Sequence, residues 1–389
     1  MYYISIMIQR EIESYANSIY RHFPIIFLTG PRQSGKTTLA KAMFSHLPYV
    51  LLELPDQGRL AREDPRSFLM KYPRGAILDE VQNVPELFSY LQGIVDDNRE
   101  VKFVLTGSQN FLLNEKITQS LAGRSGIVTL LPLSLRELKD KIEKTRYEDW
   151  IFRGFYPELY NRKVPPELYY PGYVQTYLER DVRSLQNVGS LAQFNLFLKL
   201  CAGRVGQVLN LSALAVDAGV SVNTSKAWLS VLEASYVIFK LQPHHRNFKK
   251  RLVKSPKLYF SDTGLACHLL GIERAAQLST HFALGALFEN LVIAECSKQR
   301  LAQGKREGLS YWRDNKGMEI DLLVEDGDDI RVYEIKSGRT FNTSYFKNLK
   351  YWEKLSRSKL KSTIIYGGDI GQSTPGGMLK SWRDLVTEF

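Results

Sequence analysis

Cysteine, long apolar runs and low-complexity segments are scarce or absent in this sequence of 389 residues. Its cysteines lie far apart in apolar surroundings, which predicts buried, reduced thiols and favours a cytoplasmic protein. They are Cys201, Cys267 and Cys296, and no group of Cys and His has zinc-site spacing. No apolar run reaches the roughly 18 residues of a membrane span, so we expect no membrane partner. We also expect no signal peptide, because the first residues lack a basic region.

Negative charge is also in deficit. Lys and Arg together number 52 and Asp and Glu together 41, so the formal net charge is +11. Such an excess favours a nucleic-acid partner, although many basic proteins bind none. A single core serves at most about 250 to 300 residues. We therefore expect at least two domains.

Short apolar runs alternate with helical patterns over the first 140 residues. The apolar runs predict strands at 25–30, 49–54, 75–80, 102–108 and 126–134. Helical spacing predicts helices at 8–20, 36–47 and 85–97. Strands that alternate with helices in this way predict a parallel α/β sheet with right-handed crossovers.

A phosphate-binding motif lies between the first strand and the second helix. Residues 30–37 fit G-x-x-x-x-G-K-[ST] at every fixed position. The glycines allow a tight turn that points backbone N–H groups at phosphate oxygens, and the following helix N-terminus favours an anion. Lys36 should reach the β- and γ-phosphates, and the Thr37 hydroxyl should bind Mg²⁺. The predicted ATP-binding residues are Gly30, Pro31, Arg32, Gln33, Ser34, Gly35, Lys36, Thr37, Thr38 and, after a later strand, Ser108.

Polar groups end the next two predicted strands. Asp79 and Glu80 follow an apolar run, so Asp79 is expected to hold Mg²⁺ through water and Glu80 to polarise the attacking water. Thr106, Ser108 and Gln109 end the following strand, where a polar side chain can sense the γ-phosphate. A simple turn is the alternative for these three residues.

The central part of the sequence has a different character. Residues 136–200 are mostly helical, and 211–241 read as a helix, a turn at Gly219, a second helix and an extended run. That order is typical of a helix-turn-helix with a wing. The stretch 244–257 is rich in Lys and Arg and would suit contact of a wing with a phosphate backbone. The helix-turn-helix favours DNA rather than RNA as the partner. A solvated, charged loop is the alternative.

Acidic residues recur in the strand-like runs after about residue 275. Asp321 lies in an apolar strand, and Glu334 and Lys336 share one face of the next strand. Glu289 can join them from the preceding helix, and Glu319 shares the face of Asp321. Carboxylates with a lysine are typical of a metal-dependent phosphodiesterase using Mg²⁺ or Mn²⁺. Charged residues that alternate on an exposed sheet face are the alternative.

Several motifs together resemble a known family. GPRQSGKTT, LDEVQ, LTGSQ and SLAGR (120–124) look like prokaryotic AAA-type ATPases with a C-terminal domain similar to PD-(D/E)XK nucleases. The likeness extends to GFYPELY (154–160), YVQTYLERDVR (173–183) and YFSDTGL (259–265), and so covers nearly the whole chain. It implies that Arg124 is an arginine finger, in competition with Arg180 and Arg183. A structural ion pair is the alternative for Arg124, and a finger could act within one chain or on a neighbour.

We therefore predict an α/β protein with a P-loop AAA-type parallel-sheet core (1–140), a helical lid (141–200) and a winged-helix region (201–274). A restriction-endonuclease-like α/β domain follows (275–389).

The expected function is ATP hydrolysis, with the nucleotide state controlling DNA engagement and the nuclease-like domain. The rival hypotheses are a nucleotide-switched interaction module with an inactive nuclease fold, and a DNA-binding regulator with slow turnover. A homo-oligomer is an open alternative. The predicted catalytic residues are Glu80, Lys36, Arg124, Glu334 and Lys336; the predicted metal ligands are Thr37, Asp79, Glu289, Asp321 and Glu334.

Overall fold

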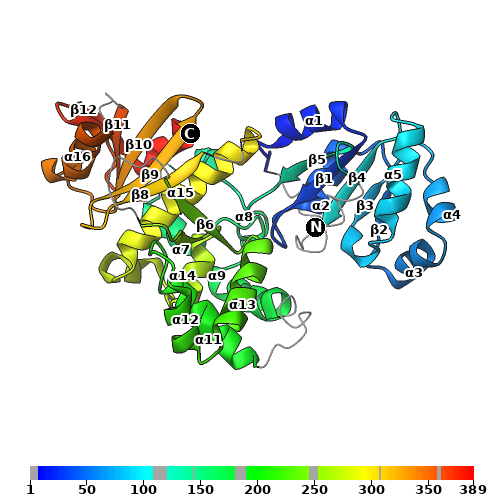
Figure 1. The fold of residues 1–389 in the computed structure, drawn as a ribbon, viewed down its shortest axis with the longest axis horizontal. Coiled ribbons are helices and arrows are strands. Elements are labelled where there is room, and N and C mark those ends of the chain that lie inside the picture. Colours follow the sequence, from blue (N-terminus) through cyan, green and yellow to red (C-terminus); the bar gives the residue numbers. More distant parts are fainter. Residues whose placement is uncertain are drawn as a thin grey trace.

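Two β-sheets organise the protein. The computed structural model describes residues 8–107, 121–142, 145–179, 190–244, 253–305, 308–356 and 361–389. A five-stranded sheet has the order β2-β3-β4-β1-β5, and an eight-stranded sheet has the order β12-β13-β11-β10-β9-β8-β6-β7. In Figure 1 the five-stranded sheet, coloured blue to cyan, lies on one side of the molecule and the second sheet on the other.

The five-stranded sheet is parallel at every pairing. Its strands are β1 (Ile25–Thr29), β2 (Tyr49–Leu51), β3 (Ile77–Asp79), β4 (Phe103–Gly107) and β5 (Ser125–Thr129). Its helices are α1 (Glu13–His22), α2 (Lys36–Met43), α3 (Pro55–Glu63), α4 (Pro65–Met70) and α5 (Leu87–Asp97), with the short turn η1 (Val81–Asn83). The predicted α/β core is confirmed, and α3 and α4 are additional to the predicted helices.

Alternating side chains of β1 explain why helices cover both faces of this sheet. Ile25 and Phe27 belong to the cluster that contains residues of α3, α4 and α5. Ile26 and Leu28 belong to the cluster that contains residues of α1 and α2. Successive residues of a strand point to opposite faces. A strand that is apolar at every position is therefore buried on both sides, as is usual in a parallel sheet.

The central region is mainly helical. Its elements are η2 (Arg136–Lys141), α7 (Tyr147–Arg153), α8 (Glu158–Asn161), α9 (Pro166–Tyr173), the π-helical turn η3 (Val174–Leu178), α11 (Leu191–Ala202), α12 (Leu211–Ala218), α13 (Val222–Ala234), β6 (Ile238–Pro243), β7 (Lys257–Phe260), α14 (Thr263–Leu269) and η4 (Ala275–Thr280). Gly219 ends α12 with a left-handed backbone, and the Ser221 side chain caps α13 by accepting from the Thr224 N–H. The helix, turn, helix and extended run predicted at 211–241 are confirmed as elements.

The last part of the chain forms most of the eight-stranded sheet. Its elements are α15 (Leu284–Ala302), β8 (Leu309–Arg313), β9 (Glu319–Asp326), β10 (Asp329–Lys336), η5 (Thr343–Phe346), α16 (Lys347–Ser356), β11 (Lys361–Tyr366), β12 (Gln372–Thr374), β13 (Gly377–Ser381), η6 (Trp382–Asp384) and α17 (Leu385–Glu388). Strands β8, β9 and β10 are antiparallel neighbours, whereas β10, β11 and β13 are parallel neighbours.

The hairpin β6–β7 joins the central region to this sheet. Gln242 and Pro243 of β6 pair with Ser310 and Tyr311 of β8. One hydrophobic cluster accordingly contains buried residues from Leu133 to Phe389. The extended run that the sequence indicated as a wing is therefore part of a larger sheet.

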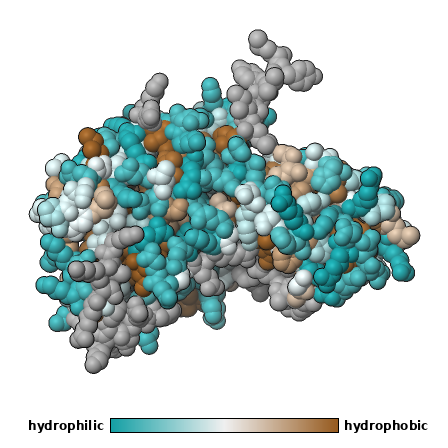
Figure 2. All heavy atoms as spheres, turned by 90° about the horizontal axis from the view of Figure 1, so that it is seen from above, coloured by the Kyte–Doolittle hydropathy of each residue, from teal (hydrophilic) through white to brown (hydrophobic). Residues whose placement is uncertain are grey.

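The surface and the thiols agree with the composition. Figure 2 shows a face covered mostly by hydrophilic residues, with scattered apolar ones. Among the described residues, no helix is long and apolar enough to cross a membrane. All three cysteines are free and buried, as predicted, and burial raises the pKa of the Cys201 thiol to about 12. These thiols are consequently protonated and unreactive at neutral pH.

Candidate functional site

The phosphate loop connects β1 to α2. Gly30 has a φ of +145°, and a Cβ atom there would lie 2.1 Å from the carbonyl oxygen of Leu130. Gly35 has a φ of +96° and immediately precedes α2. Both positions need a backbone that L side chains rarely adopt. The two glycines of the motif are thus explained by the turn itself and by the close approach of β5.

Lys36 lies across this loop. Its Nζ donates to the carbonyl oxygens of Gly30, at 3.0 Å, and of Pro31, at 2.8 Å, and its side chain is buried. The Ser34 side chain is also buried, and no described residue forms a hydrogen bond with its Oγ. A lysine and an unsatisfied hydroxyl next to a helix N-terminus are groups that suit a nucleotide phosphate. The loop residues therefore fit the predicted ATP.

Asp79 gathers three hydroxyl groups at the end of β3. Its Oδ2 accepts from the Thr37 hydroxyl at 2.9 Å and from the Tyr49 hydroxyl at 2.7 Å. The Thr106 hydroxyl donates to its other oxygen. A threonine hydroxyl beside a carboxylate fits a hydrated Mg²⁺ ion. The structure thus brings Thr37, Asp79 and Thr106 together.

Tyr49 was not predicted from sequence. It begins β2, which pairs with β3 so that Leu51 lies beside Asp79. Burial, and then the hydrogen bond to Asp79, raise the pKa of the Tyr49 phenol far above its ordinary value. Tyr49 therefore keeps its proton and donates to the carboxylate. Only the strand order reveals this contact.

Glu80 has a left-handed backbone, with a φ of +56°. Its N–H donates to the Thr106 hydroxyl at 3.3 Å, and its carboxylate accepts from the Gln82 side chain. A non-glycine residue in this conformation is strained, and such strain is concentrated at functional sites. Glu80 thus lies beside the Asp79 group, as the predicted roles require. Ser108 and Gln109 are outside the described residues.

Two tyrosines of the central region contact the phosphate loop and the end of β1 that precedes it. The Gln33 side-chain amide donates to the Tyr177 hydroxyl at 2.9 Å, and the Arg32 guanidinium lies 5.5 Å from the centre of the Tyr177 ring. The Thr29 hydroxyl donates to the Tyr236 hydroxyl at 3.2 Å. Gln33 and Tyr236 both have positive φ values. No sequence signal predicted these contacts, because Arg32 and Gln33 occupy variable positions of the motif.

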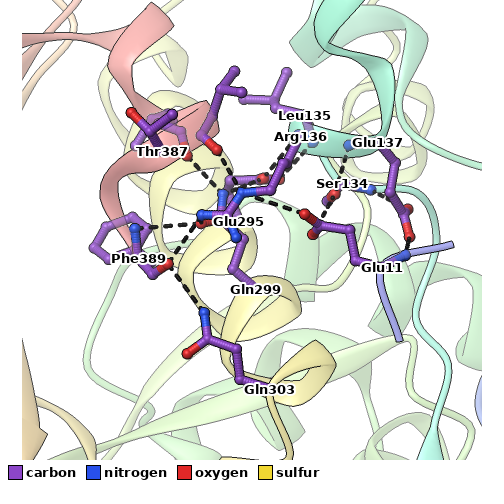
Figure 3. A network of polar contacts seen from close by, with 12 residues as sticks. Glu11, Ser134, Leu135, Arg136, Glu137, Glu295, Gln299, Gln303, Thr387 and Phe389 are labelled. Carbon is purple, nitrogen blue, oxygen red and sulfur yellow. Dashed lines mark hydrogen bonds and ion pairs between the residues drawn. The ribbon is translucent and has the colours of Figure 1, made fainter. Parts of the chain in front are cut away.

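A buried polar junction fixes the segment that leaves the five-stranded sheet. Glu295 of α15 accepts from the backbone N–H of Leu135 at 2.8 Å, and the Arg136 guanidinium donates to the Phe389 carbonyl oxygen at 3.0 Å (Figure 3). Glu137 accepts from the Arg10 side chain at 2.9 Å, and Arg10 also donates to the Ser34 carbonyl. The phosphate loop is thus connected through Arg10 and Glu137 to the junction.

Arg124 does not reach the ATP site of its own chain. Its guanidinium forms two hydrogen bonds to Asp96, at 2.6 and 2.8 Å. It precedes β5, which runs parallel to β1, whereas the phosphate loop follows β1. Arg124 therefore lies at the opposite end of the parallel strands from the phosphate loop, and in this structure it pairs with Asp96 instead. The alternative of an ion pair is observed, and a finger acting on a neighbouring chain stays a prediction. Arg180 and Arg183 are outside the described residues.

Four acidic residues converge in the C-terminal region. Glu289 of α15 and Glu319 and Asp321 of β9 each offer an oxygen, and these oxygens lie within 4.8 Å of one another. Glu334 of β10 lies beside them, and its Oε1 accepts from the Lys336 Nζ at 2.7 Å. We call Glu289, Glu319, Asp321 and Glu334 the acidic cluster. Lys336 Nζ also lies 3.7 Å from an Asp321 oxygen.

Burial favours the protonated forms of two glutamates in the acidic cluster. It raises the pKa of Glu289 to about 7, and burial together with Asp321 raises the pKa of Glu334 to about 8. The Oε2 atom of Glu334 is buried and has no hydrogen-bond partner among the described residues. Such an oxygen is costly to bury unless something satisfies it. Carboxylate oxygens in this arrangement fit a hard divalent cation.

The basic stretch 244–257 is only partly as expected. Residues 245–252 are outside the described residues, and Lys254 is exposed. Lys257, however, is only 2% exposed. Its Nζ lies 2.9 Å from Glu289 Oε1 and also contacts Glu319. Contact of Lys257 with a DNA backbone is therefore excluded in this structure, because the lysine is inside the acidic cluster.

Comparisons with known proteins now identify the chain. Residues 22–139 match the family described as an AAA domain, and 144–276 and 284–382 match two domains of unknown function (DUF8612 and DUF4143). The uncharacterized proteins Rv2008c of Mycobacterium tuberculosis and Mb2031c of Mycobacterium bovis are 32% identical over 351 residues, which cover 89% of this chain and 77% of each relative. The chain belongs to the same family as these mycobacterial proteins. Residues 22–139 are its AAA domain, which supports an ATP-binding ATPase.

A more distant relative and two solved structures are also similar. An uncharacterized protein of Haemophilus influenzae is 22% identical and covers 78% of this chain and 74% of its own length. A Walker-type ATPase of Pyrococcus abyssi, PABY2304, is 17% identical over 68% of this chain and 96% of its own, with a TM-score of 0.47. RuvB of Thermotoga maritima is 17% identical over 59% of this chain and 87% of its own, with a TM-score of 0.31. Neither score reaches 0.5, so the assignment rests on the family matches.

Proposed function

We propose that this AAA-type ATPase couples ATP hydrolysis at the phosphate loop to DNA binding or processing by its central and C-terminal regions. The observation that carries the coupling is that the phosphate loop and the preceding end of β1 contact two tyrosines of the central region. Gln33 and Arg32 contact Tyr177, and Thr29 contacts Tyr236. A phosphate that draws the loop inward alters these contacts directly.

In the proposed mechanism each residue has a separate task. Lys36 leaves the carbonyl oxygens of Gly30 and Pro31 and donates to the β- and γ-phosphates. Thr37 and Asp79 hold Mg²⁺, which when bound offsets the phosphate charge. Glu80 accepts a proton from the attacking water, and Thr106 orients the Asp79 carboxylate and the Glu80 backbone.

Hydrolysis is tested by substitution of Lys36 and Glu80. Lys36→Ala should abolish nucleotide binding, and Glu80→Gln should bind ATP but lower turnover about 100-fold or more, since general-base catalysis contributes about 10² to 10⁴. Glu100→Gln, which changes an exposed glutamate, is the matched control. Wild-type turnover in Glu80→Gln would remove Glu80 from the mechanism.

Support for a DNA partner comes from charge and from local architecture. The net charge is +11, Lys254 is exposed, and α12 and α13 form a helix-turn-helix pair. DNA affinity should fall steeply with salt, since phosphate contacts release counterions. It should also differ between ATP-bound and nucleotide-free protein, and Lys36→Ala should remove that difference. Affinity that ignores both salt and nucleotide would contradict the proposal.

The acidic cluster favours a second function, metal-dependent cleavage of a phosphodiester. Glu289, Glu319 and Asp321 would hold Mg²⁺ or Mn²⁺, which when bound activates water, and Lys336 would orient that water. Purified protein with Mn²⁺ and ATP should then cut DNA, and Glu334→Ala and Lys336→Ala should lose the cutting. DNA left uncut by the wild type would instead favour the rival function, a nucleotide-switched interaction module.

A further inference from the structure

A lysine of the central region contacts the acidic cluster of the C-terminal region. Lys257 begins β7, in the central region, whereas Glu289 and Glu319 belong to the C-terminal region. Lys257 Nζ contacts both carboxylates, at 2.9 Å from Glu289 Oε1. Tyr259, two residues later on the same face of β7, donates to the same Glu289 oxygen. Strand β7 therefore delivers both a cation and a hydrogen-bond donor to Glu289.

The ammonium group lies where a divalent cation would be held. A hard cation lies about 2.0 to 2.6 Å from its carboxylate oxygens. A cation on Glu289 Oε1 would consequently lie no more than about 5.5 Å from Lys257 Nζ, given their 2.9 Å contact. Like charges at such a distance repel strongly in a partly buried site. The lysine and a divalent cation thus compete for the same oxygens.

An independent observation indicates that this is a cation site rather than a closed ion pair. Glu334 is 2% exposed, and its Oε2 has no hydrogen-bond partner within the part of the chain that the structure describes. Its other oxygen accepts from Lys336 and from Asn348. Among the described residues, Lys336 and Asn348 thus leave one buried carboxylate oxygen of the cluster unsatisfied. A hard cation bound in the cluster would satisfy this oxygen by coordination.

We propose that Lys257 is a built-in counter-cation of the acidic cluster, which takes the place of a divalent metal ion between Glu289 and Glu319. A hard cation such as Mn²⁺ binds there only when this ammonium group is removed or withdrawn. The inference rests on the proposed metal-binding role of the cluster but not on DNA cleavage. It assigns the control of that site to a residue of the central region.

The test is Mn²⁺ binding to the full chain without nucleotide, measured by the paramagnetic resonance signal of free Mn²⁺. Lys257→Met, which keeps the length of the side chain, should bind one more Mn²⁺ per chain than the wild type, or bind it at least tenfold more tightly. Lys240→Met is the matched control, since Lys240 lies on the neighbouring strand β6 and pairs with Glu233 instead. Adding Glu319→Gln to Lys257→Met should remove the gain.

The outcomes separate this inference from the cleavage proposal. Equal Mn²⁺ binding by the wild type and Lys257→Met overturns the inference. Tighter Mn²⁺ binding by Lys257→Met without any DNA cleavage contradicts only the cleavage proposal. Lys257→Gln serves if Lys257→Met does not fold. The melting temperature gives a third test, because a given Mn²⁺ concentration should raise it less in the wild type than in Lys257→Met. An equal rise in both proteins would also overturn the inference.

Discussion

The side-chain amide of Gln33 donates a hydrogen bond of 2.9 Å to the hydroxyl of Tyr177, 144 residues further along the chain. Gln33 lies in the phosphate loop, and Tyr177 lies in the π-helical turn η3. π-Helical turns are rare and frequently occur at functional sites. The pair therefore connects the nucleotide site to an irregular segment of the central region.

Removing the Tyr177 hydroxyl should weaken this connection. Tyr177→Phe keeps the ring that Arg32 contacts but loses a hydrogen bond worth about 1 kcal/mol, or about fivefold in an equilibrium. ATP turnover should change less than about threefold. The ATP-induced protection of Val174–Leu178 from hydrogen exchange should decrease by up to that fivefold factor. Tyr90→Phe, at an exposed tyrosine of α5, is the control; equal decreases in both variants would argue against the coupling.

Thr37 should tolerate serine but not alanine. Its hydroxyl donates to Asp79 at 2.9 Å and is expected to bind Mg²⁺. Thr37→Ala should lower ATP turnover about 100-fold and raise the Mg²⁺ concentration needed for half-maximal rate. Thr37→Ser should stay within about tenfold of the wild type. If the rate of Thr37→Ala depended on Mg²⁺ concentration as the wild-type rate does, a role of Thr37 in binding Mg²⁺ would be excluded.

Gly30 and Gly93 should respond oppositely to alanine. A Cβ atom at Gly30 would lie 2.1 Å from the Leu130 carbonyl oxygen, and the φ of +145° is strained for alanine. Gly30→Ala should therefore cost about 2 kcal/mol or more in free energy of unfolding. At Gly93, within helix α5, a Cβ atom meets nothing within 4 Å. Gly93→Ala should stabilise by about 0.5 to 1 kcal/mol. Urea unfolding followed by circular dichroism gives both values.

The buried junction should make stability depend on pH. Burial raises the pKa of Glu295 above its ordinary 4.5. The unfolded chain therefore loses this proton first as pH rises, so the stabilising contribution is complete below pH 4.5 and is lost as pH rises through the raised pKa. Glu295→Gln removes this titration. The difference in melting temperature between the wild type and Glu295→Gln should accordingly shift in favour of the variant from pH 4.5 towards 7. A difference that is constant with pH would contradict the assignment.

Local sequence patterns correctly predicted the features that are formed by residues close together in the sequence. The strand β1, the phosphate loop and the carboxylates after β3 all follow from apolar runs, turn residues and motif spacing. The side-chain period also predicted that Glu334 and Lys336 share a face, and their Nζ–Oε1 distance is 2.7 Å. In each case the interacting groups are adjacent or belong to consecutive elements.

Contacts between distant elements were not predictable in this way. Arg124 was interpreted from motif order, but the direction of β5 places it with Asp96, away from the loop. Lys257 was interpreted from charge density, but the β6–β7 hairpin directs it into the acidic cluster. Charge in a sequence does not show whether a lysine lies in water or against carboxylates, since only the packing of the hairpin determines that.

Pairing between β6 and β8 also determines how a fragment that lacks the central region would behave. The His244 N–H donates to the Tyr311 carbonyl oxygen at 2.7 Å, next to the paired residues Pro243 and Tyr311. A fragment that begins at α15 would lack β6 and would leave β8 with unpaired backbone groups at an open edge, which favours aggregation. The same fragment would lack Lys257 and Tyr259. Its affinity for metal ions would therefore describe a different site from the one in the whole chain.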